Sequence, residues 1–240
     1  MKRIALFLLS LLTMCSFTSC VDSSDDYAKY SIFGITRGYQ SEWYIQSDDN
    51  KNLYVGDDSY LTAYQVTDGQ RVIVQYDDMQ TDKVPTGYDK VIKVYGITDI
   101  PWGSTETIFD EDEIENIGTE PVELLDGNFI SATRRLLNMN ISFLASMSSG
   151  NMHEFTLVKV NDPDYAPMDT DEGYINFELV HDPGEDKMAN TYSYYGWISW
   201  DLQAYNLIYE NEDLATAKGV IVGMTNLQGK KVYYRAKFMD

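Results

Sequence analysis

The chain has 240 residues, of which 44% are hydrophobic, and it carries 38 acidic against 18 basic side chains for a formal net charge of −20. So acidic a surface repels phosphate backbones and anionic lipid surfaces, which argues against nucleic-acid binding and against electrostatic attachment to a membrane. The length and hydrophobic content are sufficient for an ordinary packed core in one large or two small domains.

The N-terminus has the order of a bacterial lipoprotein signal. A basic start precedes an apolar run over residues 4–12, and small residues stand directly before Cys20. The run is too short for a spanning helix, which needs roughly 20 apolar residues. We therefore predict that residues 1–19 are removed and that Cys20 becomes a lipidated N-terminus. More than one acyl chain on this cysteine would give the stable attachment that a single chain does not.

Both cysteines of the chain lie in this segment, Cys15 inside the signal and Cys20 at its end. The mature chain therefore has no free thiol, which excludes a disulfide, a cysteine nucleophile and a thiolate metal site. Removal of residues 1–19 also takes away Lys2 and Arg3, so the net charge of the remaining chain is −22.

The first part of the mature chain has the alternation of β-strands. Residues 20–31 are polar and acidic, and they predict a flexible tether. Apolar side chains then recur with period two over 60–66, 71–76 and 90–97, with turn signals between these segments. Strands at this spacing, without a helical period between them, predict a small all-β barrel or sandwich over residues 32–108.

The pattern changes over residues 98–127, and we place the domain boundary after residue 108. The acidic run over 110–115 is more typical of a solvated loop or the first turn of a short helix than of a ligand site.

The second part, residues 109–240, predicts an antiparallel β-sandwich. Its clearest strand is 137–145, where apolar and mostly polar side chains alternate. A hairpin over 218–238, with Gly229 in its turn, closes the chain. The other expected elements are strands at 155–157, 175–179 and 197–199 and one short helix at 210–218.

Candidate catalytic and metal-binding groups give no consistent pattern. His153 and His181 fit no local zinc motif, and we interpret them as structural or surface histidines. The acidic loop over 162–172 offers oxygen ligands of the kind that calcium prefers, but it lacks the EF-hand register, and a polar connector is the favoured interpretation. We expect no catalytic residue, no metal and no cofactor.

Aromatic side chains are the strongest candidates for a binding surface. They are densest over residues 192–200, and we select Tyr194, Tyr195, Trp197 and Trp200 as candidate ligand-binding residues. In an alternating strand one of the two tryptophans should point away from the core. Exposed rings can stack on sugars or anchor a protein partner, whereas the alternative role for each is to fill the core.

The order of these segments resembles that of the NigD-like lipoproteins of Bacteroides. Gly69–Tyr76 and Gly87–Ile100 are similar to the N-terminal OB-like domain of that family, and Gly118–Val122 is similar to its inter-domain entry. The C-terminal β-sandwich domain is represented by His153–Val158, Phe177–Asp186 and Gly196–Leu202. The family often has Arg and Asn beside the second histidine, where this chain has Val180 and Asp182.

The resemblance implies an exported, lipid-anchored, two-domain protein without enzymatic activity, at the surface of the outer membrane. It also implies an immunity role of the kind proposed for a bacteriocin-associated operon. Our first hypothesis is therefore a binding protein of the cell envelope, whose charge would suit a basic protein or peptide. The alternatives are a surface glycan-binding protein and, third, a glycosidase that uses two carboxylates.

Overall fold

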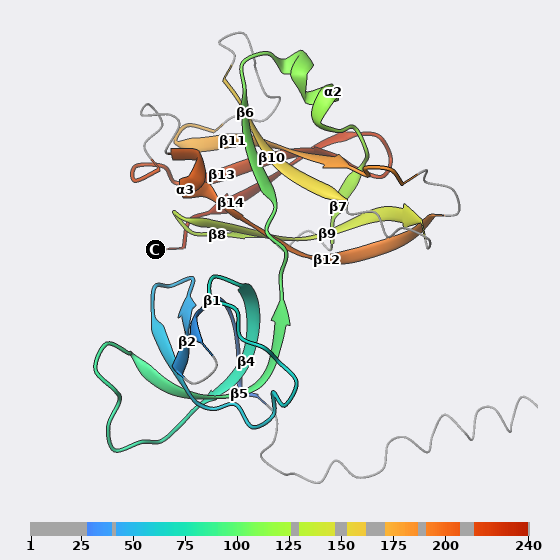
Figure 1. The fold of residues 1–240 in the computed structure, drawn as a ribbon. Coiled ribbons are helices and arrows are strands. Elements are labelled where there is room, and N and C mark those ends of the chain that lie inside the picture. The colour runs from blue at the N-terminus through green and yellow to red at the C-terminus, as the bar shows by residue number, and fades with distance from the viewer. Residues whose placement is uncertain are drawn as a thin grey trace, which may run out of the picture.

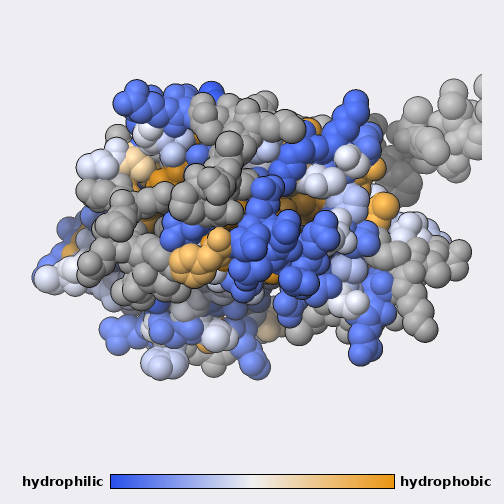
Figure 2. Space-filling model, turned by 90° about the horizontal axis from the view of Figure 1, so that it is seen from above, coloured by the Kyte–Doolittle hydropathy of each residue, from blue (hydrophilic) through white to orange (hydrophobic). Residues whose placement is uncertain are grey.

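The computed structural model describes residues 28–39, 42–125, 130–146, 153–161, 171–186, 191–206 and 214–239. They form two β-domains joined by one short connection (Figure 1). The predicted signal segment and Cys20 lie outside the described residues. Seen from the sandwich end, the described surface is largely hydrophilic, with small separate hydrophobic areas (Figure 2).

The N-terminal domain is a closed five-stranded barrel with the strand order β1-β2-β3-β5-β4. It corresponds to the OB-like domain that the resemblance implies. The β3–β5 pair is parallel and the other four pairs are antiparallel. The strands are β1 (Tyr30–Tyr39), β2 (Glu42–Ser47), β3 (Asn52–Asp57), β4 (Arg71–Asp78) and β5 (Lys90–Asp99).

The barrel core is filled by the inward side chains of alternate positions, such as Ile45, Val72, Val74 and Ile92. The predicted strands at 71–76 and 90–97 are confirmed as β4 and β5.

Two expectations for this domain are wrong. Residues 60–66 form turns and irregular backbone, and Leu61 and Val66 pack from this loop against the barrel core. Their apolar character reflects that cover and not a strand. In addition, β1 begins at Tyr30, so the end of the predicted tether is already part of the barrel.

The C-terminal domain is a two-sheet sandwich, which confirms the predicted fold class. One sheet has the order β14-β13-β11-β10-β6, and the other has the order β12-β9-β7, with β8 also beside β9. Within the larger sheet, β6–β10 and β11–β13 are parallel, so this sheet is mixed where we expected antiparallel pairing throughout. The strands are β6 (Ser104–Ile108), β7 (Val122–Leu124), β8 (Ile130–Ala132), β9 (Leu136–Ser146), β10 (Glu154–Val160), β11 (Tyr174–Asp182), β12 (Thr191–Asp201), β13 (Gly219–Thr225) and β14 (Lys231–Lys237).

The sandwich core lies between the two sheets. The apolar face predicted for 137–145 supplies Leu137, Met139 and Ile141, all fully buried, and they belong to the same cluster as Phe177 and Val222 of the larger sheet. The closing hairpin is confirmed as β13 and β14. Gly229 in its turn has φ +72°, a conformation that side chains with a Cβ rarely adopt.

The helices of the described residues are short. The acidic run forms η2 (Glu111–Glu113) and α2 (Ile114–Ile117), and Asp110 caps the first of them by accepting a hydrogen bond from the Asp112 N–H. A third, α3 (Leu202–Asn206), follows β12 directly. The helix expected at 210–218 is wrong over 214–218, where 214–216 form a turn and 217–218 have irregular backbone, and its first residues lie outside the described part. No helix of the described segments is long and apolar enough to cross a membrane.

The sandwich domain begins earlier in the chain than the boundary that we placed after residue 108. Residues 104–108 are β6, which pairs with β10 and therefore belongs to the sandwich. The connection between the domains is thus confined to residues 100–103, between the end of β5 and the start of β6.

Candidate functional site

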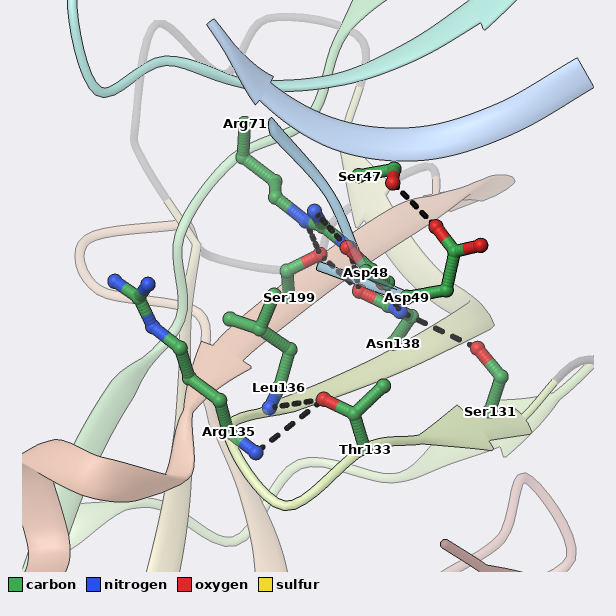
Figure 3. Close-up of polar contacts among 10 residues, drawn as sticks. All are labelled: Ser47, Asp48, Asp49, Arg71, Ser131, Thr133, Arg135, Leu136, Asn138 and Ser199. Carbon is green, nitrogen blue, oxygen red and sulfur yellow. Dashed lines mark hydrogen bonds and ion pairs between the residues drawn. The ribbon is translucent and has the colours of Figure 1, made fainter. Parts of the chain in front are cut away.

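A buried polar cluster joins the barrel to the sandwich (Figure 3). Arg71, the first residue of β4, is fully buried and forms a bidentate ion pair with Asp48, at 2.5 Å from Nη1 to Oδ1 and 2.5 Å from Nη2 to Oδ2. Across the domain boundary, Arg71 Nη2 donates to Asn138 Oδ1 at 2.8 Å, and Nε donates to Ser199 Oγ at 3.1 Å. Asn138 also donates to Asp48 at 2.9 Å. Because the buried charge is paired and hydrogen-bonded, the cluster fixes the domains against each other.

The connection between the domains lies against β12. The Gly103 N–H donates to the Ser199 carbonyl at 2.8 Å, and the Ser199 N–H donates to the Pro101 carbonyl at 3.1 Å. Gly103 also lies directly on the ring of Trp200, since a Cβ built at this position would be 2.0 Å from Nε1 of the indole. Only glycine permits so close an approach of the chain to the buried ring.

A cleft of about 910 Å³ opens beside this junction. Its walls come from the end of the barrel, from residues 98–104, which include the connection, from β9, from the start of β10 and from residues 194–198 of β12. Aromatic and aliphatic side chains dominate the lining, and they include Trp102, Phe143, Phe155 and Trp197. A concave, mostly apolar surface at a domain boundary is a typical place for a ligand.

The charged side chains of the cleft are acidic. Asp99 and Glu154 line it, and both are exposed. Neither lysine nor arginine occurs among the described residues of its lining. The cleft therefore favours a neutral or cationic group over an anion.

The structure separates the four aromatic residues that we selected. Tyr194 and Tyr195 line the cleft and are 41% and 73% exposed. Trp197 lines it as a half-buried side chain, with its ring 4.7 Å from that of Phe33 in an edge-to-face contact. Trp200 is fully buried in the sandwich core, and its Nε1 donates to the Phe155 carbonyl at 3.2 Å. Trp200 is thus not available to stack on a ligand.

Trp102 is a cleft residue that sequence reasoning missed. It is 40% exposed, and Nε1 of its indole donates to the Gly69 carbonyl at 3.4 Å. We interpreted the segment around it only as a break in the strand pattern. The signal that could have identified it is a tryptophan between Pro101 and Gly103 in a short connection. So short a connection has no core of its own in which to bury a large ring.

The two histidines form a pair in the sandwich, in which His181 is buried and the half-buried His153 also lines the cleft. His153 Nδ1 lies 2.8 Å from His181 Nε2, and His153 Nε2 lies 3.2 Å from Asp186 Oδ2. Burial and the neighbouring His153 lower the pKa of His181 to about 4, against the opposing effect of the Pro121 carbonyl. The His181 ring stacks on Phe155 at 4.6 Å. These contacts support the structural interpretation of both residues.

No group of three or more His, Cys, Asp or Glu side chains in the described part of the chain is arranged to hold a metal ion. Most of the acidic loop over 162–172 lies outside the described residues, so its interpretation as a polar connector, and not a calcium site, stays a prediction. Of its acidic residues, Asp171 and Glu172 are described, and Asp171 Oδ2 lies 3.7 Å from Arg235 Nη1.

Comparison with known proteins identifies both domains. Residues 37–100 match the model of the NigD-like N-terminal OB domain, and residues 105–238 match that of the NigD-like C-terminal beta sandwich domain. The gap between the two matches, residues 101–104, overlaps the connection that the structure places at residues 100–103. No protein of curated description matches the sequence.

Several solved structures have a similar fold, and three of them come from Bacteroides species. A protein of unknown function from Bacteroides vulgatus has a TM-score of 0.64 and 18% identity, over 88% of this chain and 90% of that one. A protein from Bacteroides fragilis, provisionally named a lipoprotein, has a TM-score of 0.57 and 10% identity, over 88% and 98%. A NigD-like immunity protein from Bacteroides caccae has a TM-score of 0.52 and 18% identity, over 85% and 90%. With the two domain matches, the chain belongs to the NigD-like family.

Proposed function

We propose that the protein is a non-catalytic binding protein of the bacterial cell envelope, held at the surface of the outer membrane by lipid on Cys20. The signal-like N-terminus supports the anchoring, and the Bacteroides fragilis structure of similar fold is provisionally named a lipoprotein. The observation that carries the binding function is the aromatic, acidic cleft of about 910 Å³ at the domain junction.

The junction supports binding because it is rigid. The Arg71 cluster and the adjacent contact between Phe33 and Trp197 hold the two domains together, and the Arg71 guanidinium lies 5.6 Å from the centre of the Phe33 ring. A cleft whose walls are fixed before a ligand arrives costs less conformational entropy on binding than one that must be assembled.

A basic protein or peptide is the first candidate ligand. Asp99 and Glu154 are the charged groups of the cleft, and the whole chain carries a net charge of −20. Opposite charge speeds the encounter of two partners and disfavours acidic competitors. The name of the Bacteroides caccae relative, a NigD-like immunity protein, is consistent with a role in binding a toxic peptide.

A glycan is the second candidate, and the exposure of Tyr195 and Trp102 at the cleft favours it. Exposed rings of this kind can stack on the apolar face of a sugar. Hydrolysis of a glycan is not proposed, because Asp99 and Glu154 are both exposed, whereas the general acid of a glycosidase lies in a buried pocket.

The test is capture of ligands by the full chain in detergent micelles, from envelope extract and from a glycan array. Trp102→Ala and Tyr195→Ala remove cleft rings, and Tyr39→Ala is the matched control, since Tyr39 is 76% exposed and does not line the cleft. We expect both cleft variants to lose at least one specific ligand that the control retains. Equal capture by all three variants would contradict a binding function for the cleft.

A further inference from the structure

Strand β12 lies at the edge of the smaller sheet. The order β12-β9-β7 gives it β9 as its one partner strand, and the pairing runs without a register shift from Thr191 opposite Ser146 to Asp201 opposite Leu136. In such a ladder every second residue directs its main-chain N–H and C=O away from the partner strand. One side of β12 is therefore a row of main-chain donors and acceptors.

Ser199 shows which residues face outward. Its N–H and C=O bond to Pro101 and Gly103 of the connection, and not to β9. Because the alternation is unbroken, the main-chain groups of Trp197, Tyr195 and Ser193 point the same way. Within the described part of the chain, the outward groups of Tyr195 and Ser193 have no strand beside them.

This stretch of edge is not protected in the usual ways. Proteins blunt exposed edges with proline, lysine or a bulge, and residues 191–197 contain none of these. Ser193 and Tyr195 are exposed, and the neighbouring side chains are mostly tyrosine. An open, aromatic edge invites another chain to pair with it.

The same edge borders the cleft. Residues 194–198, five consecutive positions, all line it. Consecutive side chains of a strand point to opposite faces of the sheet, so what these five share is the strand edge itself. A segment that paired with this edge would lie in the cleft, in line with the connection that already pairs at Ser199.

We propose that the β12 edge over residues 193–197 binds an extended basic peptide as an added strand, in the cleft. The proposal deepens the proposed function and rests on it. The peptide's main chain pairs with the outward groups of Ser193 and Tyr195. Its Lys or Arg side chains lie near Asp99 and Glu154 and over the exposed tyrosine rings, where a cation is favourable. Its alternate side chains are apolar and face the lining of the cleft.

A second copy of this chain is a weaker occupant. Pairing of two β12 edges would bring two acidic clefts together, on molecules that each carry a net charge of −20. A glycan could use the aromatic rings but has no main chain to pair with the edge. Both therefore become outcomes of the test.

The first measurement is selection from a phage library of random decapeptides on the full chain in detergent micelles. We expect the selected peptides to alternate basic and apolar residues. A scan in which single peptide N–H groups are methylated then tests the pairing directly, because only every second N–H of an added strand faces β12. Methylation in one register should weaken binding about tenfold, the typical value of one hydrogen bond, and in the other register should change it little.

The second measurement uses variants of the edge. Tyr195→Pro removes one outward N–H and leaves the ladder to β9 intact, as proline on an edge strand allows. Tyr195→Thr is the matched control, since it removes the same ring but keeps the N–H and suits a strand. We expect peptide affinity to fall about tenfold further in the proline variant than in the threonine variant. Thermal unfolding of both variants tests whether each retains the fold. If the proline variant does not fold, the methylation scan on the unaltered chain still tests the pairing.

Three outcomes would overturn strand addition. The first is an equal effect of methylation in both registers, and the second is a set of selected peptides without basic residues. The third is a dimer of the free chain that the peptide does not dissociate. If the peptides still lose affinity in Trp102→Ala, the binding function of the cleft survives and only the strand-addition mode fails. If neither peptide nor glycan depends on Trp102, the proposed function fails as well.

Discussion

Arg71 of the barrel and Asn138 of the sandwich are joined by a hydrogen bond of 2.8 Å, and both side chains are fully buried. The same guanidinium pairs with Asp48 and donates to Ser199, so one side chain from β4 reaches two strands of the other domain. The junction is therefore a specific polar contact and not a flexible linker. It holds the cleft walls in one arrangement.

Replacement of Arg71 by methionine should strongly destabilise the protein. The variant leaves the Asp48 carboxylate, 8% exposed, without its cation, and the removal of one partner of a buried pair costs about 3–5 kcal/mol. We expect the free energy of unfolding in urea, followed by tryptophan fluorescence, to fall by that amount. Lys51→Ala, which removes an ion pair with Asp49 at the surface, is the control and should leave the midpoint almost unchanged. An equal effect of the two substitutions would contradict the role of Arg71.

The buried His181 should make the protein sensitive to mild acid. Its pKa is about 4 in the folded protein, below the ordinary 6.5, so the unfolded chain takes up the proton first as the pH falls. The stability contribution is complete above pH 6.5 and is lost progressively between pH 6.5 and pH 4. The difference corresponds to about 3 kcal/mol. Urea unfolding of the unaltered chain at pH 7, 6, 5 and 4 measures this loss.

The matched variant for this measurement is His181→Gln, whose amide can form a hydrogen bond with His153 but does not titrate. We expect a lower stability at pH 7 and a much flatter profile between pH 6.5 and pH 4. A variant that lost stability with pH as steeply as the unaltered chain would show that other groups cause the acid sensitivity.

Much of the fold could be predicted from the sequence because its long strands alternate cleanly. β9 buries Leu137, Met139 and Ile141 on one face, and the closing hairpin has a glycine at the turn position that requires it. β1, β2 and β3 were not predicted. β1 does not alternate cleanly, since Gly34, Ile35 and Thr36 are all buried, while β2 and β3 are short and β3 has a register shift after Val55. Period two in residues 60–66 was misleading, because two apolar side chains of a loop cover the barrel.

Less of the candidate site could be predicted, because its parts are distant in the chain. Arg71 contacts Asn138 and Ser199, which are 67 and 128 residues away in the sequence. Periodicity says which face of a strand is buried, but not which strand of another domain will lie against it. The aromatic stretch of β12 was identified, whereas its division into cleft residues and the core residue Trp200 required the structure.

That division predicts opposite results for Trp200 and Tyr195. Trp200→Phe leaves a cavity in the core and removes the donor to the Phe155 carbonyl, so it should lower the free energy of unfolding by about 1–3 kcal/mol. Tyr195→Ala changes an exposed side chain and should alter stability by less than about 0.5 kcal/mol. Ligand affinity, measured by titration calorimetry, should fall for Tyr195→Ala and persist in folded Trp200→Phe. The reverse assignment would exclude the cleft as the binding site.

Lipid attachment at Cys20 predicts a simple labelling result. Cells that express the full chain and are grown with radioactive palmitate should yield a labelled, membrane-bound protein. The label is expected because the acyl chains are attached to the cysteine that follows the signal. Cys20→Ala should abolish the label and release the protein from the membrane fraction. Cys15→Ala should change neither. Membrane retention of an unlabelled Cys20→Ala protein would show that the apolar segment itself is the anchor.

An acidic cleft and a basic ligand predict strong salt dependence. Raising the ionic strength from 0.05 to 0.3 M shortens the Debye length, so a steered association should slow by about tenfold while dissociation changes less. Stopped-flow mixing with a basic peptide selected on the full chain measures both rates. The variant with Asp99→Asn and Glu154→Gln keeps the shape of the cleft and removes its two charges. At low salt its association rate should be lower than that of the unaltered chain, and this rate should change little as salt is added. A salt dependence as steep as that of the unaltered chain would show that the steering charges lie outside the cleft.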